Sequence, residues 1–410
     1  MRCNGLVLHK VMSMKIRVSS LIECLSICCV FIFSSYDCLI RLFPWIPFSA
    51  LRLLLFGGLF LGATVFRKAG NQNNMIFLLL MYSIIGFEYL LASDTQAVYI
   101  KTLFFNITSL SCLWVYFFAF SLVEQPIKWH KRMVLLAYFN MFLLILTTMA
   151  GRYSTADRVL NYVGLGISAA MWIPLMIQSI FLTEGRIRVF HVIGTSISIV
   201  FIGVYGNRGS LVAIFSYVMY CILKYTKAKH KVLIVFFLCF GCWIIYKYQA
   251  LIIAFVVNIV SDLGIFSRNL NLLLNGKITY TTHRTDEIWV RIIEAIDKRP
   301  LLGYGLCYDR VLSGAIGIYA HNIVLEVFVS FGIPIGGFLL ILHIFLAGKF
   351  ILGQVDSGWE RLFSPFWITS TVLLMFNNSF CQLGFFWIPY GVFFAYLKSR
   401  RKRRLRSGKG

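Results

Sequence analysis

Residues 322–347 read NIVLEVFVSFGIPIGGFLLILHIFLA, and Glu326 and His343 are the only ionisable side chains in this run. About 20 consecutive apolar residues are enough for a helix to cross a bilayer. A helix is expected because lipid offers backbone amides and carbonyls no partner, so they must bond within their own segment. The run therefore predicts a membrane-spanning helix.

The rest of the 410-residue chain has the same character: 59% of its residues are hydrophobic and only 13% are charged. A soluble domain carries roughly 25% charged residues, so lipid must be the solvent for most of this chain. We expect an all-α polytopic membrane protein with about twelve spanning helices. The predicted spans are 20–40, 46–66, 75–92, 98–123, 133–150, 159–182, 189–206, 209–223, 232–248, 322–347, 363–378 and 383–397.

The distribution of Lys and Arg predicts the orientation, because basic residues concentrate in cytoplasmic segments. With the N-terminus inside, the inner segments hold 25 of the 39 Lys and Arg residues. The basic start of the chain lacks a small-residue cleavage site and is read as leading into a retained first helix. The expected organisation is nine spans in 1–248, a large outer loop in 249–321, three spans in 322–397 and a basic cytoplasmic tail in 398–410.

The net charge of +23 does not indicate nucleic-acid binding, because the basic residues lie in short caps between apolar runs. The densest cap, KSRRKRRLR at 398–406, is typical of an anchor on anionic lipid. No P-loop, HExxH or DxD motif is present, and most cysteines lie in apolar runs, where they act as small packing residues. We therefore expect no metal and no cofactor.

The outer loop contains an amphipathic segment at 286–299, followed by Pro300 and a glycine-containing turn. Its apolar residues recur at helical spacing, and charged residues lie opposite them. The apolar set is Ile288, Trp289, Ile292, Ile293 and Ile296, and the charged set is Glu287, Arg291, Glu294 and Lys298. We expect this helix to lie along the outer leaflet.

His321 is the strongest candidate for chemistry, because it stands at the outer start of the tenth predicted span. Asn322 follows it directly and Glu326 lies about one turn further on, so both could support a neutral imidazole acting as a general base. The alternative is a structural histidine, which is the commoner role of an isolated His.

Four arginines are expected on the same outer face: Arg208 in the turn GNRGS, Arg284 before the amphipathic helix, and Arg291 and Arg310 within the outer loop. Arginine suits bidentate phosphate contact, although interfacial snorkelling explains most arginines near a membrane. Five further charged residues fall inside predicted spans, which makes them functional candidates: Glu23, Asp37, Arg52, Glu88 and Lys101. Snorkelling or interhelical pairing is the simpler explanation for Asp37, Glu88 and Lys101, which lie toward the outer ends of their spans. Arg52, in the outer part of the second span, could face the same site as the four arginines.

Three segments together resemble the O-antigen ligase and O-antigen polymerase superfamily of bacterial envelopes. They are GNRGSLVAIF (206–215), HRTDEIWVRIIEAIDKRPLLGYGL (283–306) and YAHNIVLEVFVSFGIPIGG (319–337). The resemblance covers about residues 200–340 and consists of an Arg-Gly turn, an Arg five residues before a Trp, a Pro-Leu-Leu-Gly-Tyr-Gly turn and His-Asn before an apolar helix that contains Phe-Gly-Ile.

The resemblance implies a GT-C-like glycosyltransferase of the bacterial inner membrane, with a periplasmic active site and both termini in the cytoplasm. Its donor would be an undecaprenyl-diphosphate-linked oligosaccharide. By position, His321 would activate the acceptor hydroxyl, and Arg208 and Arg284 would hold the pyrophosphate. Arg291 and Arg310 would be secondary candidates for the same contact.

Polymerase and ligase share this chemistry and differ in the acceptor, which is another lipid-linked repeat unit or a lipid A core sugar. The pattern His-Asn-x3-Glu-x4-Phe-Gly-Ile at 321–333 and the turn Pro-Leu-Leu-Gly-Tyr-Gly at 300–305 favour a repeat-unit polymerase, for which a chain-length regulator is an expected partner. A flippase of lipid-linked glycans is the alternative from another class, since it too predicts twelve helices with buried charge.

Overall fold

A computed structural model of the chain describes residues 21–66, 72–105, 107–150, 158–227, 247, 284–315, 318–353, 355–376 and 378–406. All regular secondary structure in these ranges is helical, which confirms the helical fold class. The ninth predicted span and the first part of the outer loop lie outside the described residues, apart from Lys247.

Helices cover most of the first half of the chain. Leu21–Ser34 is followed by α2 (Tyr36–Leu42), α3 (Phe48–Phe66), α4 (Gln72–Leu91), α5 (Asp94–Ile100), the π-helix η1 (Lys101–Phe105), α6 (Ile107–Ser121), α7 (Pro126–Met149), α8 (Arg158–Leu182), α9 (Gly185–Tyr205) and α10 (Arg208–Tyr225). The described part of the second half contains η2 (Arg284–Trp289), α14 (Val290–Lys298), α15 (Tyr308–Ser313), α16 (Ile323–Ala347), η3 (Gly348–Leu352), α17 (Ser357–Phe376), η4 (Gly384–Trp387) and α18 (Ile388–Arg406).

Among the described residues, four helices are long and apolar enough to cross a membrane. They are Pro126–Met149, Gly164–Leu182, Gly185–Tyr205 and Ile323–Leu352. A bent pair, Leu21–Ser34 and Tyr36–Leu42, adds a fifth candidate with a 71° angle between its two parts. These helices are consistent with a helical membrane protein, and the crossing of the bilayer by all twelve predicted segments stays a prediction.

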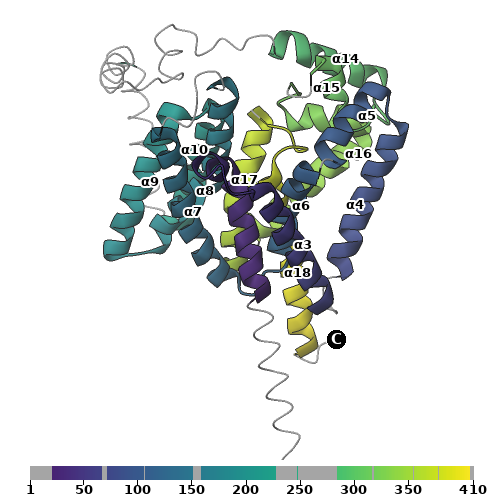
Figure 1. Ribbon diagram of the computed structural model, residues 1–410. Helices are drawn as coiled ribbons and strands as arrows, with labels where there is room; N and C mark the ends of the chain where they lie inside the picture. Colours follow the sequence, from purple (N-terminus) through teal and green to yellow (C-terminus); the bar gives the residue numbers. More distant parts are fainter. Residues whose placement is uncertain are drawn as a thin grey trace, which may run out of the picture.

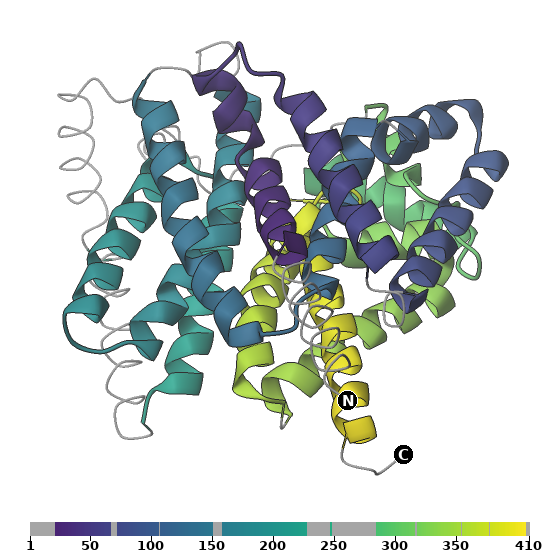
Figure 2. The ribbon, with the colours of Figure 1, turned by 60° about the horizontal axis from the view of Figure 1, so that its bottom comes forward.

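Helix α17 stands between two groups of helices (Figure 1). Helices α7, α8 and α10 pack on one side of it, and α16 and α18 contact it from elsewhere. Helices α4, α5, α14 and α15 lie on the side of α16, and the same division remains when the molecule is turned (Figure 2). Large side chains fill the interior of the bundle, and Trp114, Trp129, Trp172 and Trp359 are almost completely buried.

The predicted tenth span is not one continuous helix, because α16 is broken at Gly332, where φ is 74° and ψ is 169°. The turn 300–305, Pro-Leu-Leu-Gly-Tyr-Gly, docks into this break through its backbone. Three hydrogen bonds join them: Tyr304 N–H to Val329 C=O (2.8 Å), Gly305 N–H to Ser330 C=O (2.9 Å) and Ile333 N–H to Pro300 C=O (2.7 Å). The turn thus supplies the backbone partners that a broken helix loses.

Glycine is required on both sides of this junction. A Cβ on Gly332 would lie 2.3 Å from the carbonyl oxygen of Leu301, and a Cβ on Gly303 would lie 2.6 Å from that of Ser330. Both glycines also have positive φ, which other residues adopt only under strain. Two of the sequence motifs, Pro-Leu-Leu-Gly-Tyr-Gly and Phe-Gly-Ile, therefore form one structural unit.

The amphipathic segment is helical as predicted, but its apolar face meets protein. In α14, Ile292 and Ile296 are buried and form a cluster with Ala320 and Val329 near the start of α16. Ile293 remains 47% exposed. The expectation that the whole apolar face lies on the outer leaflet is therefore wrong, since most of it covers the first half of α16.

Candidate functional site

His321 lies directly before α16 in a left-handed backbone conformation, with a φ of 52°. Its side chain is only 7% exposed, and its ring lies 4.0 Å from that of Tyr319, centroid to centroid. Asn322 caps the helix, because its Oδ1 accepts the N–H groups of Val324 at 2.9 Å and Leu325 at 3.3 Å. Asn322 therefore supports His321 by fixing where the helix begins.

The peptide groups before His321 are held from two sides. The Ala320 N–H donates to Oδ2 of Asp309 at 3.0 Å, and the Ala320 carbonyl accepts from the indole Nε1 of Trp289 at 2.7 Å. Asp309 is fully buried and belongs to α15, whereas Trp289 ends η2. Two separate elements of the outer loop thus clamp the residue that precedes His321.

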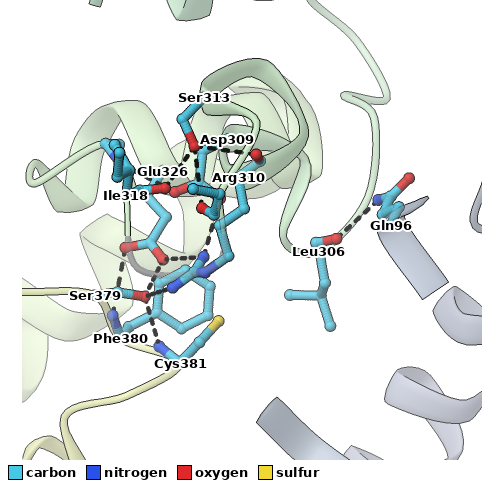
Figure 3. Close-up of polar contacts among 12 residues, drawn as sticks. Gln96, Leu306, Asp309, Arg310, Ser313, Ile318, Glu326, Ser379, Phe380 and Cys381 are labelled. Atoms are coloured by element: carbon cyan, nitrogen blue, oxygen red, sulfur yellow. Dashed lines mark hydrogen bonds and ion pairs between the residues drawn. The ribbon is translucent and has the colours of Figure 1, made fainter. Parts of the chain in front are cut away.

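Asp309 is itself part of a buried charged network (Figure 3). Nη1 of Arg310 lies 3.0 Å from Oδ1 of Asp309 and 3.6 Å from Oε1 of Glu326, and Nη2 donates to Oγ of Ser379 at 2.8 Å. Ser379 donates in turn to Glu326, whose other oxygen accepts the Phe380 N–H at 3.3 Å. The network joins α15, α16 and the segment after α17.

This network gives Arg310 a different role from the predicted pyrophosphate contact. The Arg310 side chain is 0% exposed and is occupied by two carboxylates and a hydroxyl group. Burial alone disfavours its charge, but the adjacent Asp309 carboxylate outweighs this effect and the pKa of Arg310 is raised. Arg310 is therefore a permanent cation within the fold and does not reach a substrate.

Glu326 also differs from its predicted role beside the imidazole. Its carboxylate is bound by Arg310, Ser379 and the Phe380 amide, and it is 1% exposed. Its contribution to His321 is therefore indirect, through the network that holds Asp309.

Arg208 and His321 belong to the same end of the bundle. Tyr220 and Tyr225, near the end of α10, donate hydrogen bonds to Glu360 in the first turn of α17. Because these bonds join the end of α10 to the start of α17, the two packed helices run antiparallel. Arg208, at the start of α10, therefore lies toward the end of α17 that leads to Ser379. The Arg208 side chain is exposed there.

The positions of Arg284 and Arg291 relative to His321 are less closely defined. Arg284 begins η2, the element that carries Trp289, and its side chain lies outside the described residues. Arg291 is exposed on α14, and its Nη1 donates to the Leu312 carbonyl at 3.3 Å, which ties α14 to α15. The convergence of Arg208, Arg284 and His321 on one substrate thus remains a prediction.

Helices α4 and α5 anchor the same loop from the other side. Nε2 of Gln96 donates to the carbonyls of Tyr304 at 3.0 Å and Leu306 at 2.8 Å, and Glu88 accepts the Leu306 N–H at 3.3 Å. Figure 3 shows Gln96 reaching toward Leu306. Glu88, one of the charges predicted inside a span, therefore caps a backbone group of the outer loop. Another of those charges, Glu23, forms an ion pair with Arg132 at 2.9 Å.

Sequence reasoning missed Asp309, Ser379 and Trp289 as parts of the site. Asp309 directly precedes the selected Arg310, and Ser379 ends a polar Asn-Asn-Ser stretch after an apolar helix, so both left a local signal. Trp289 was assigned to a lipid-facing surface from its helical spacing. Its hydrogen-bond partner, the Ala320 carbonyl, is 31 residues away and leaves no signal near Trp289 in the sequence.

Removal of the indole N–H tests the clamp on Ala320. We expect Trp289→Phe to speed amide hydrogen exchange at residues 320–322 about fivefold, since one hydrogen bond contributes about 1 kcal/mol. Trp387→Phe is the matched control, because the buried Nε1 of Trp387 has no hydrogen-bond partner among the described residues. Equal exchange rates at 320–322 in the two variants would show that the clamp does not hold this segment.

No protein-family model matches the chain, and no curated protein matches its sequence.

Proposed function

We propose that the chain is a metal-independent membrane glycosyltransferase that polymerises polysaccharide repeat units. The proposal includes a GT-C-like arrangement of twelve spans in a bacterial inner membrane, with the site on the periplasmic face. The donor is an undecaprenyl-diphosphate-linked oligosaccharide, and the acceptor is another lipid-linked repeat unit.

The observation that carries the proposal is the conformation of His321. A non-glycine residue with positive φ is uncommon, and such strain persists only where the surroundings enforce it. Here Trp289, Asp309 and the Asn322 cap fix the backbone on both sides of His321. A histidine held this firmly at a helix start is suited to a positional role in chemistry.

The proposed step balances as a glycosyl transfer. The imidazole of His321 takes the proton of the acceptor hydroxyl while that oxygen attacks the anomeric carbon of the donor. The bond from the anomeric carbon to the phosphate oxygen breaks, and undecaprenyl diphosphate leaves. Arginine side chains would stabilise the charge that builds up on the diphosphate.

Purified protein with a defined lipid-linked repeat unit tests the function directly. We expect a ladder of lipid-linked oligomers on a gel, with release of undecaprenyl diphosphate. Transfer only when a lipid A core acceptor is added would favour a ligase. Movement of intact donor across vesicles, without new glycosidic bonds, would favour a flippase.

Arg208 offers a test of the diphosphate contact. We expect Arg208→Ala to lower kcat/KM for the donor about 100-fold, since charge-assisted bidentate contacts are worth about 1.5–3 kcal/mol each. Arg208→Lys keeps the charge but loses the fork geometry, so its kcat/KM should lie between the values of wild type and Arg208→Ala. Arg401→Ala, in the exposed basic end of α18, is the control. Equal rates for wild type and Arg208→Ala would remove Arg208 from the site.

A further inference from the structure

The turn that docks into α16 presents two leucines outward. Leu301 is 68% exposed and Leu302 is 79% exposed, although the backbone around them is hydrogen-bonded to the break. Adjacent leucines at a rigid tip gain nothing from this position in water, because burying each would contribute about 1.5–3 kcal/mol. Their exposure therefore calls for an apolar partner.

The two halves of α16 show where lipid begins. Before the break, the helix is covered by α14 and α15 through a cluster that includes Ile292, Ile296 and Val329. After the break, large apolar side chains are exposed on successive turns: Ile333 47%, Ile335 49%, Phe338 64%, Ile341 68%, Ile344 64% and Phe345 64%. The lipid-facing part of this segment thus starts at the break.

Its length agrees with this boundary. The segment from Ile333 to Leu352 has about 20 residues and is about 30 Å long at roughly 1.5 Å per residue. The hydrocarbon core of a bilayer is also about 30 Å thick. Residues 333–352 alone can therefore cross the membrane, which leaves 323–331 and the His321 segment beyond the hydrocarbon.

The turn lies level with that boundary, because three backbone hydrogen bonds fasten it to residues 329–333. Its flanks have the composition of a membrane interface. Lys298 and Arg299 are exposed just before it, and the Arg299 guanidinium lies 4.7 Å from the centre of the Tyr304 ring. Basic and aromatic residues of this kind concentrate at the level of lipid headgroups.

We propose that Leu301 and Leu302 insert into the acyl chains of the leaflet on the His321 side, with Lys298 and Arg299 at the phosphate level. The backbone of Leu301 and Leu302 lies against Gly332, beside the exposed Ile333 at the start of the apolar half of α16, so the occupant is lipid. The inserted turn would fix the height, relative to the bilayer, of the outer module, by which we mean α14, α15 and the His321 segment. The same loop continues into Asp309, whose carboxylate accepts the Ala320 N–H. The proposal concerns the bilayer and stands apart from the proposed catalytic function.

Site-specific photocrosslinking tests the proposal in the full-length protein. A benzophenone amino acid is placed at Leu302, with the protein in nanodiscs of phosphatidylethanolamine and phosphatidylglycerol. We expect lipid adducts at Leu302 and at the lipid-facing control Phe338, and none at Glu294, which is exposed on α14. Leu301 serves as a second insertion site if the Leu302 variant is not produced.

Two results would overturn the proposal. One is the lack of lipid adducts at both leucines while Phe338 forms them, which would place the turn in water. The other is efficient crosslinking of Leu302 to a second copy of the chain, which would make the turn a protein interface. Neither result depends on enzymatic activity, so the lipid contact and the proposed function stand or fall separately.

Discussion

Replacing His321 with alanine is expected to abolish polymer formation while the protein stays folded in the membrane. A positioned general base contributes typically about 10²–10⁴-fold to a rate, so the residual activity should fall below about 1%. The expected readout is a loss of the oligomer ladder from purified protein, with donor binding retained.

The control is another buried histidine, His343, which lies within α16. His343 bonds Tyr390 at 2.9 Å and Thr371 at 2.9 Å, well along α16 from the proposed site. His343→Gln keeps hydrogen-bonding capacity and should retain most of the polymer yield. If His321→Ala makes polymer at the wild-type rate, His321 is not the base and the proposed mechanism is lost.

The fold class was predictable because it follows from composition and run length, which are local properties. Helix α7, for example, has 24 residues, its most apolar part has a mean hydropathy of 1.7, and its range overlaps the predicted span 133–150. Partners are not local properties. An amphipathic period at 286–299 predicts a helix with one apolar face, but it does not say whether lipid or protein covers that face.

The break in α16 is a second feature that depends on a distant partner and could not be predicted from local sequence. Gly332 and Pro334 stand in the quoted run, and both weaken a helix, yet apolar length alone favoured one unbroken span. The break is stabilised by the 300–305 turn, about 30 residues earlier in sequence, whose backbone replaces the lost helical bonds. Only the folded arrangement could reveal that the two motifs meet.

Candidate site residues were predictable in type but not in role. Arginines near an outer membrane face suit phosphate binding, and Arg208 remains exposed at the expected end of the bundle. Arg310 fits the same pattern in sequence, but its side chain is enclosed by Asp309, Glu326 and Ser379. The two arginines differ in burial, which neither spacing nor charge pattern encodes.

Loss of the Arg310 charge is therefore expected to destabilise the protein strongly. Arg310→Met would leave two buried carboxylates, Asp309 and Glu326, without their cation. Removing one partner of a buried charged pair typically costs about 3–5 kcal/mol, because the remaining charge is uncompensated. Thermal unfolding in detergent should show a markedly lower midpoint, and the Ala320 amide should exchange faster because Asp309 is no longer held.

An exposed ion pair provides the matched control for this prediction. Arg403 lies 3.5 Å from Asp356, and their side chains are 65% and 44% exposed. Surface pairs contribute about 0–1 kcal/mol, so Arg403→Met should leave the midpoint almost unchanged. The double variant Arg310→Met/Glu326→Leu should recover part of the lost stability, because it also removes one of the unpaired carboxylates. Equal midpoints for Arg310→Met and Arg403→Met would mean that the buried network does not hold the outer module together, and His321 would then need another source of rigidity.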